Sequence, residues 1–324
     1  MISDDIYKAA QLLNNEEVVA IPTETVYGLA GNIFSQKAIS KIFELKKRPH
    51  TNPLIIHIGT KNQIFDLVHD VPELAQKLSD KFWPGPLTLI LKKNKNVPDL
   101  VTGGKDTVAI RMPNHPTTLK LLSLLPFPLA APSANPFSSI SPTSALHVDT
   151  YFSDTLPMVL DGGICQDGIE STIIGFEDGG PVVYRLGSTP IEAIQNEIGP
   201  VKIKNFTMAN PVAPGMMIKH YAPKTKMLLT ENLNDAIRLN EGKKIGLLLF
   251  QSAMNSESIK HQEVLSSHGN LKEAASNLYA AMHRLDHLNL DIIIAQKFPD
   301  HDFGTAINDR LSRAAQSEKT IYNI

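Results

Sequence analysis

The chain contains only one cysteine, Cys165, among its 324 residues. A single thiol excludes an internal disulfide and a zinc site built from cysteines, and it is typical of proteins from a reducing compartment. No apolar run approaches the roughly 20 residues that a membrane-spanning helix needs. Residues 1–22 also lack the basic segment and apolar stretch of a signal peptide. These absences predict a cytoplasmic protein with no membrane partner.

A large excess of charge of either sign is also missing. The chain has 31 Lys and Arg against 33 Asp and Glu, which gives a net charge of −2. Hydrophobic residues make up 42% and charged residues 20%, an ordinary globular composition. The length is sufficient for two domains with real cores. The surface as a whole is therefore not that of a polyanion-binding protein, and any basic site must be local.

The common catalytic and nucleotide-binding motifs are absent from the sequence. In the nearest approach to a phosphate loop, Gly104 and Lys105 are followed by Asp106, and Asp99 occupies the place of the first glycine. There is no G-x-G-x-x-G, G-x-S-x-G or H-E-x-x-H pattern. Neither a standard phosphate loop nor a familiar nucleophile therefore explains the function.

Two stretches of interleaved helix and strand patterns are present. In the first stretch, helices are predicted at 5–15, 35–48, 72–83 and 116–125, and strands at 18–22, 52–58, 86–93, 107–113, 128–135, 158–163, 171–176 and 182–187. In the second stretch, strands are predicted at 225–230, 243–250 and 290–296, and helices at 271–288 and 306–315. Because the alternation is not strict, the first stretch predicts an open, mixed α/β sheet with its loops at one end.

A proline-rich segment separates these stretches. Residues 200–224 contain four prolines and no clean periodicity, which indicates a linker. We therefore predict an N-terminal α/β domain over 1–205, a linker over 206–223, and a smaller α/β domain over 224–324.

Several polar residues lie on strands that are otherwise apolar. Thr107 and Arg111 share one face by the two-residue strand period, His57 shares a face with Ile55, and Arg185 ends its strand. A guanidinium suits carboxylate or phosphate. Together with the cationic end of the helix at 35–48, these residues suggest a pocket for a small polyanion. Each also has a structural interpretation: the histidine as a core residue, the cations as partners of the helix dipole, and the arginines as ion pairs.

Taken together, the motifs resemble one family. "IPTETVYGLAGN" (21–32), "KKRPHTNPLIIHI" (46–58), "FWPGPLTLIL" (82–91), "VAIRMPNHP" (108–116), "APSANPFSSISPT" (131–143) and "GIESTII" (168–174) occur in this order. This set resembles the YrdC-domain family. "PGMMIKHYAP" (214–223) and "FGTAINDRLSRAA" (303–315) resemble the linker and C-terminal domain of its long form, the L-threonylcarbamoyladenylate synthases. The resemblance implies a YrdC-like twisted sheet followed by a Rossmann-like domain.

The resemblance also implies an activity. Family members join L-threonine, bicarbonate or CO2, and ATP with Mg²⁺ into threonylcarbamoyl-AMP and pyrophosphate. A tRNA threonylcarbamoyl-transfer complex takes up the product to make N6-threonylcarbamoyladenosine, and weak contact with tRNA is compatible with this role. The reaction requires no protein nucleophile and no protein-built metal site, because catalysis rests on positioning and electrostatic stabilisation.

Site residues follow by matching each motif. Those that match the family's threonine site are Thr25, His57, Arg111, Ala131 and Ser171. Those that match its ATP site are Lys46, Arg48, Asn52, Thr107, Ser133 and Arg185. In the linker, His220 and Tyr221 are candidates for closing the site or for anchoring the second domain. The chain departs from the family pattern at Ala131, where Thr or Ser is frequent, and at Ile218, where Tyr or His is common.

Two other classes of function are alternatives to the synthase reaction. A non-catalytic RNA-binding module of the YrdC type is disfavoured by the net charge of −2 and by the lack of aromatic–basic interleaving. A carbamoyl-transfer role like that of hydrogenase-maturation relatives would require zinc-finger modules, which one cysteine cannot supply.

Overall fold

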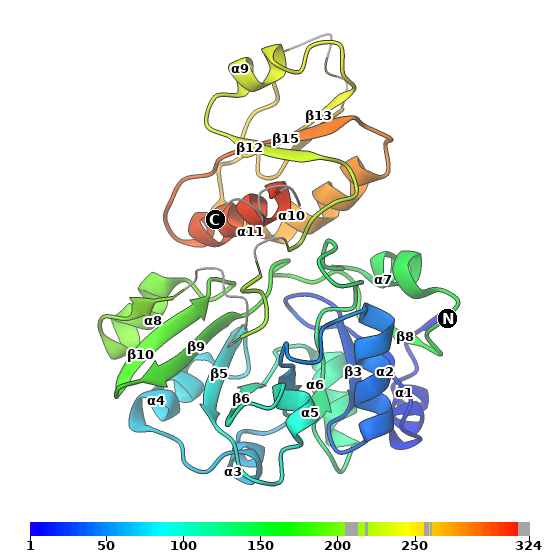
Figure 1. Ribbon diagram of the computed structural model, residues 1–324, viewed down its shortest axis with the longest axis vertical. Helices are drawn as coiled ribbons and strands as arrows, with labels where there is room; N and C mark the ends of the chain where they lie inside the picture. The colour runs from blue at the N-terminus through cyan, green and yellow to red at the C-terminus, as the bar shows by residue number, and fades with distance from the viewer. Residues whose placement is uncertain (205–212, 218–219, 256–258, 260, 317–324) are drawn as a thin grey trace.

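Residues 1–204, 213–217, 220–255, 259 and 261–316 are described by the computed structural model. Figure 1 shows two α/β bodies stacked along the long axis of the molecule. We call residues 1–204 the first body and residues 224–316 the second body. In the described part of the chain, no helix is long and apolar enough to cross a membrane.

The first body is built on one mixed sheet with strand order β1-β8-β2-β3-β7-β4-β6-β5-β9-β10-β11. The strands are β1 (Ile2–Ser3), β2 (Val19–Ile21), β3 (Gly28–Asn32), β4 (Ile55–His57), β5 (Leu87–Lys92), β6 (Thr107–Arg111), β7 (Leu129–Ala130), β8 (Val159–Leu160), β9 (Thr172–Glu177), β10 (Gly180–Arg185) and β11 (Lys202–Ile203). β4 and β6 are parallel, whereas β5 and β6 are antiparallel. The predicted mixed α/β architecture is therefore confirmed.

Helices cover this sheet. They are α1 (Ile6–Asn14), α2 (Gln36–Lys46), α3 (Ile64–Leu67), α4 (Glu73–Phe82), α5 (Asp99–Thr102), α6 (Pro116–Ser123), α7 (Ala145–Phe152) and α8 (Ile191–Ile198). The four predicted helices correspond to α1, α2, α4 and α6, with slightly shorter bounds. The other four, which have four to eight residues, were not predicted from the sequence.

The end of α2 explains how its cationic run enters the interior. The Ser35 side chain caps the start of the helix, and Lys47 adopts a left-handed conformation (φ 52°) at its C-terminus. The predicted end at residue 48 is therefore wrong by two residues, because Lys47 reverses the chain. As a result, Lys46 and Arg48 are both buried, with exposed fractions of 1% and 7%.

Strand register brings two of the predicted site residues together. In the parallel pair β4–β6, His57 lies opposite Arg111 and Ile55 lies opposite Ala109. Paired residues on neighbouring strands project to the same face of a sheet. The sheet therefore places the imidazole and the guanidinium side by side.

The second body has a parallel sheet of order β12-β15-β13-β14. Its elements are β12 (Met227–Thr230), α9 (Leu233–Arg238), β13 (Ile245–Leu249), β14 (His261–Val264), α10 (Leu271–Asp286), β15 (Ile292–Gln296) and α11 (Phe303–Ala315). An all-parallel α/β sheet fits the Rossmann-like class. β14 is an edge strand with the polar sequence "HQEV", so no apolar pattern marks it.

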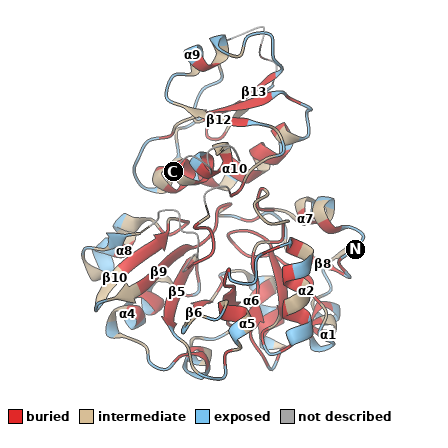
Figure 2. Ribbon diagram, in the orientation of Figure 1, coloured by how far each residue is buried: buried red, intermediate tan, exposed pale blue. Residues whose placement is uncertain are grey.

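The two bodies share a hydrophobic core. Helices α10 and α11 face the first body (Figure 1), and Figure 2 shows buried residues along both of them. One buried cluster joins Val26, Ile140 and Ile169 of the first body to Tyr279 and Met282 of α10. Apolar burial across this boundary stabilises one arrangement of the two bodies. The linker boundaries stay a prediction, since residues 205–212 and 218–219 lie outside the described residues.

A stacked histidine pair adds a titratable contact at this boundary. The rings of His147 on α7 and His283 on α10 lie 4.1 Å apart between centroids, with an interplanar angle of 24°. Burial, and after it the charges of Arg284 and His287, lower the pKa of His147 to about 4. Burial also lowers the pKa of His283 to about 3, with His147 as the next cause, while Asp286 and the Ser141 carbonyl oppose the shift.

This pair predicts acid destabilisation. In the unfolded chain both imidazoles bind protons below about pH 6.5, whereas the folded protein keeps them neutral until their lowered pKa values are reached. We therefore expect the free energy of unfolding to fall between about pH 7 and 4.5 by roughly 4 kcal/mol more in the native protein than in a His147→Gln/His283→Gln variant, because each imidazole contributes about 2 kcal/mol. Urea denaturation at the two pH values tests this, with His268→Gln at an exposed position as the control. An unchanged pH dependence in the double variant would contradict it.

Candidate active site

A cavity opens where the ends of the sheet strands meet the linker. Its empty volume is about 560 Å³ including the open mouth. The predicted site residues that line it are Thr25, Arg48, His57, Arg111, Ala131, Ser133, Ser171, Arg185, His220 and Tyr221. Residues assigned separately to threonine, ATP and the linker thus meet in one place.

Three of the predicted residues do not line the cavity. The Lys46 ammonium donates to the backbone carbonyl oxygens of Ser133 and Asn135, the latter at 2.6 Å. Asn52 accepts a hydrogen bond from Arg48 Nη2 at 2.7 Å. Lys46 and Asn52 therefore do not line the cavity, but they hold two residues that do, Ser133 and Arg48. Thr107 lines a separate outer cavity together with Lys105 and Tyr184.

Arg111 forms the centre of one side of the cavity. Its Nη1 donates to Thr25 Oγ1 at 2.9 Å, its Nε donates to the Gly85 carbonyl at 3.2 Å, and its Nη2 lies 2.8 Å from Glu24 Oε1 in a buried ion pair. The Nη2 group makes no hydrogen bond within the described residues. The guanidinium is thus fixed at the cavity wall by Glu24, Thr25 and the Gly85 carbonyl, and a ligand that reaches it meets a pre-oriented cation.

His57 is a neutral neighbour of Arg111. Burial, and after it the Arg111 charge, lower the pKa of His57 to about 3. Its Nδ1 lies 3.3 Å from the Ile55 carbonyl oxygen. Since a carbonyl can only accept, Nδ1 carries the proton of this contact and Nε2 is an acceptor. His57 therefore offers a ligand a hydrogen-bond acceptor without a charge.

Two buried guanidinium groups form the other side. Arg185 donates from Nε to the Ser171 carbonyl and from Nη2 to Ser171 Oγ, both at 3.0 Å. Arg48 donates to the Pro53 carbonyl at 2.8 Å, and burial lowers its pKa to about 9, with the Arg185 charge as the next cause. In the part of the chain that the structure describes, neither Arg48 nor Arg185 forms an ion pair. Two buried cations without a carboxylate partner form an anion site.

The linker closes the wall beside these arginines. The Pro214 carbonyl accepts a hydrogen bond from Arg185 Nη1 at 3.4 Å. A side chain at Gly215 would clash with Arg185, because an added Cβ would lie 2.7 Å from its Cδ. Among the described residues, the buried Tyr221 hydroxyl and His220 Nδ1 have no hydrogen-bond partner. Both linker candidates therefore present unsatisfied polar atoms at the cavity, whereas Ile218 lies outside the described residues.

Sequence reasoning missed the acidic residues of the site and their partners. Glu24 and Glu170 lie inside the quoted motifs "PTET" and "GIESTII", but neither was assigned a role. Arg310 was also missed, although it lies on the helix face of Ile307 and Ala314, which are buried. An arginine on the apolar face of a predicted helix indicates a buried charge that needs a partner, and this was the signal available in the sequence.

Comparison with known proteins identifies the class to which this fold and site belong. The Telomere recombination family, which covers Sua5, YciO and YrdC proteins, matches residues 11–187. The family described as threonylcarbamoyl-AMP synthase, C-terminal domain, matches residues 189–316. The chain belongs to the Sua5/YrdC family and has the two-domain architecture of its long form.

Individual relatives cover nearly the whole chain. The threonylcarbamoyl-AMP synthase of Pyrococcus abyssi is 40% identical over 321 residues, which span 95% of this chain and 93% of the relative. That of Bacillus subtilis is 40% identical over 96% of this chain and 92% of the relative. The crystal structure of P. abyssi Sua5 complexed with L-threonine superposes with a TM-score of 0.89 at 39% identity, covering 96% of this chain and 94% of that one.

Proposed function

We propose that this protein is a threonylcarbamoyl-AMP synthase, which joins L-threonine, bicarbonate or CO2, and ATP and releases pyrophosphate. One observation carries the proposal: one cavity holds Arg111 on one side and, on the other, Arg48 and Arg185, two cations without a carboxylate partner among the described residues. Such a cavity suits a small carboxylate next to a polyphosphate. Near full-length similarity to synthases, together with a relative solved with L-threonine, supports the same assignment.

Threonine would bind at Arg111. The guanidinium donates to the threonine carboxylate, and Thr25, Ala131 and Ser171 shape the surrounding wall. The threonine amine adds to CO2 and loses a proton, which gives a carbamate. Neutral His57 supplies an acceptor toward the amino acid and adds no charge to repel its ammonium group. Held beside the nucleotide, the carbamate oxygen reacts as if intramolecularly.

ATP would bind along Arg48, Ser133 and Arg185. The carbamate oxygen attacks the α-phosphorus, the bond to the bridging oxygen breaks, and pyrophosphate leaves. The two guanidinium groups stabilise the charge that develops on the phosphate oxygens. Lys46 and Asn52 act through the residues they hold, and Thr107 stays a predicted ATP contact.

Mg²⁺ would enter with ATP as part of the substrate. The described residues include no group of three or more His, Cys, Asp or Glu side chains that could hold a metal ion. A magnesium ion coordinated mainly by phosphate oxygens and water fits this donor set. We further propose a cytoplasmic location, and transfer of the product to a tRNA threonylcarbamoyl-transfer complex with at most weak contact of this chain with tRNA.

Omission of substrates tests the proposed reaction. We expect pyrophosphate release from ATP and Mg²⁺ to require both threonine and bicarbonate, because the nucleophile forms only from the two together. A coupled pyrophosphatase assay measures it, with each component omitted in turn. Release with neither present would show a nucleotide hydrolase. If ATP binds but no pyrophosphate is released, and the protein binds RNA, the result would favour the alternative of a non-catalytic RNA-binding module.

A further inference from the structure

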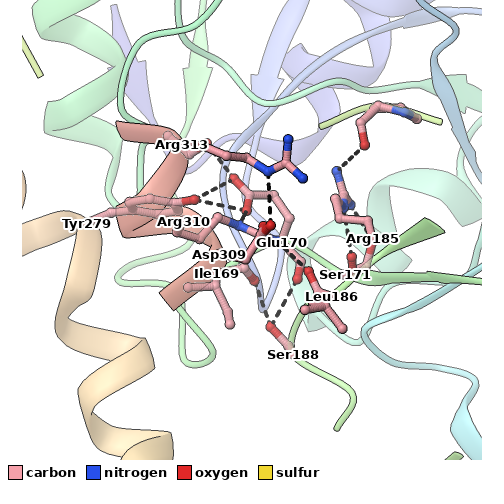
Figure 3. Close-up of polar contacts among 12 residues, drawn as sticks. Ile169, Glu170, Ser171, Arg185, Leu186, Ser188, Tyr279, Asp309, Arg310 and Arg313 are labelled. Carbon is pink, nitrogen blue, oxygen red and sulfur yellow. Dashed lines mark hydrogen bonds and ion pairs between the residues drawn. The ribbon is translucent and has the colours of Figure 1, made fainter. Parts of the chain in front are cut away.

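A carboxylate at the edge of the cavity is bound by the second body. Glu170 lines the cavity and is 5% exposed. Its Oε2 accepts hydrogen bonds from Arg310 Nε at 2.8 Å and from the Tyr279 hydroxyl at 3.0 Å, while its Oε1 accepts from Ser141 Oγ at 2.6 Å. Figure 3 shows this cluster, with Arg310 reaching from α11 and Tyr279 from α10. Polar contacts therefore cross the boundary between the bodies next to the proposed active site.

Arg310 reaches two loops at once. It is fully buried, with an exposed fraction of 0%, and its Nη2 donates to the Leu186 carbonyl at 2.7 Å. Its Nη1 pairs with Asp309 at 2.7 Å, and its guanidinium lies 4.8 Å from the centre of the Tyr221 ring. One side chain of the second body thus fixes residue 170 and residue 186 of the first.

The residues adjacent to these two anchor points are proposed substrate contacts. Ser171 follows Glu170 in the chain, and Arg185 precedes Leu186. Arg185 and Ser171 are joined by the two hydrogen bonds already described (Figure 3). A shift of either loop would displace both groups, and misplacement by about 1 Å is enough to cost roughly 100-fold in rate.

The positive charge of Arg310 also keeps the Glu170 carboxyl group ionised. Burial raises the pKa of the Glu170 carboxyl, but the charges of Arg310 and then Arg185 outweigh burial and lower it to about 2. Glu170 is therefore an anion that attracts both arginines. While Arg310 is bound to Glu170, Arg185 keeps its own charge for a ligand. Without Arg310, the buried carboxylate would draw Arg185 to itself, because an unpaired buried charge is unfavourable.

We propose that Arg310, supported by Tyr279, is a positioning residue for the synthase reaction: it neutralises Glu170 so that Arg185 remains available to the triphosphate of ATP. This inference rests on the proposed function and adds to it a role for the second body in nucleotide binding. It also predicts a larger effect on the ATP side of the cavity, which contains Arg185, than on the threonine side, which Arg310 reaches only through Glu170 and the adjacent Ser171.

The test is a set of four variants of the full-length chain. In Arg310→Met, we expect the KM for ATP to rise by about 30-fold, the size expected for loss of a charge-assisted contact, while the KM for threonine changes much less. Arg310→Lys keeps the charge and should fall between the native protein and Arg310→Met. In Glu170→Gln/Arg310→Met, the anion that captures Arg185 is gone, so the KM for ATP should return most of the way to the native value. Arg284→Met is the matched control, since that arginine of the same body is 57% exposed and pairs only with Glu263 at 2.7 Å among the described carboxylates.

The outcomes separate the possible explanations. Equal rises in both KM values, with no recovery in the double variant, would overturn the inference and show a merely structural ion pair. If Arg310→Met fails to fold, the decision falls on the folded Arg310→Lys variant, where an unchanged KM for ATP would likewise overturn it. If the native protein releases no pyrophosphate, the proposed function fails. Calorimetric binding of ATP to the same variants then decides whether Arg310 controls nucleotide affinity.

Discussion

Replacing Arg111 with alanine is expected to abolish threonine binding while ATP still binds. Arg111 lines the cavity and is held in place by Glu24, Thr25 and the Gly85 carbonyl. Loss of one partner of a buried charge pair costs about 2–5 kcal/mol, which corresponds to a loss of roughly 30-fold to several thousand-fold in affinity for the carboxylate. Calorimetric titration with L-threonine and, separately, with ATP measures the two affinities.

The control for this variant concerns Glu24. Removing Arg111 leaves a buried carboxylate without its cation, which costs about 3–5 kcal/mol of folding stability. A Glu24→Gln/Arg111→Met variant removes both charges, so we expect its thermal stability to recover while threonine binding stays lost. Equal losses of threonine and ATP affinity in this stable double variant would show that Arg111 supports the fold of the cavity and does not bind the amino acid.

The residues that the sequence could predict are those whose motifs place them on strand ends. The two-residue period put Arg111 and His57 on definite strand faces, and the register of β4 and β6 brings them together. Arg185 ends β10 as predicted. These positions depend on local periodicity and on the order of motifs, and both can be read along the chain.

The positions to which the side chains of the basic run at residues 46–48 point could not be predicted in the same way. Lys46 was a candidate phosphate contact, but its ammonium group binds the carbonyl oxygens of Ser133 and Asn135. The left-handed conformation of Lys47 sets this direction, and it is uncommon for a residue other than glycine, so the sequence does not announce it. Thr107 shows the same limit, since its strand face was predicted while the cavity it lines was not.

Contacts between the two bodies were the least predictable part of the site. Glu170 and Arg310 are separated by 140 positions in the chain, and no motif relates them. Their pairing follows from how α11 docks on the first body, which depends on the shared core around Ile169 and Tyr279. The sequence offered only the linker residues His220 and Tyr221 as candidates for closing the site or for anchoring the second domain. The structure instead shows a specific buried ion pair next to the cavity.

Truncation after residue 204 is expected to lower synthase activity at least about 100-fold, because it removes three parts of the site at once. The linker wall at Pro214 and Gly215 is lost, as are the polar atoms of His220 and Tyr221. The Arg310 and Tyr279 contacts to Glu170 are lost as well. Pyrophosphate release by residues 1–204, compared with the full chain at equal concentration, measures the effect.

Folding of the truncated chain must be separated from its activity. The first body keeps its own sheet and core but exposes Val26, Ile140 and Ile169, so we expect it to fold with a lower Tm. A Glu170→Gln substitution in the truncated chain removes the stranded carboxylate and should raise that Tm without restoring activity. This combination distinguishes the two roles of the second body, because stability depends on covering the carboxylate and the apolar patch, whereas catalysis also requires the linker wall and Arg310. Full activity in residues 1–204 would refute the view that the second body completes the site.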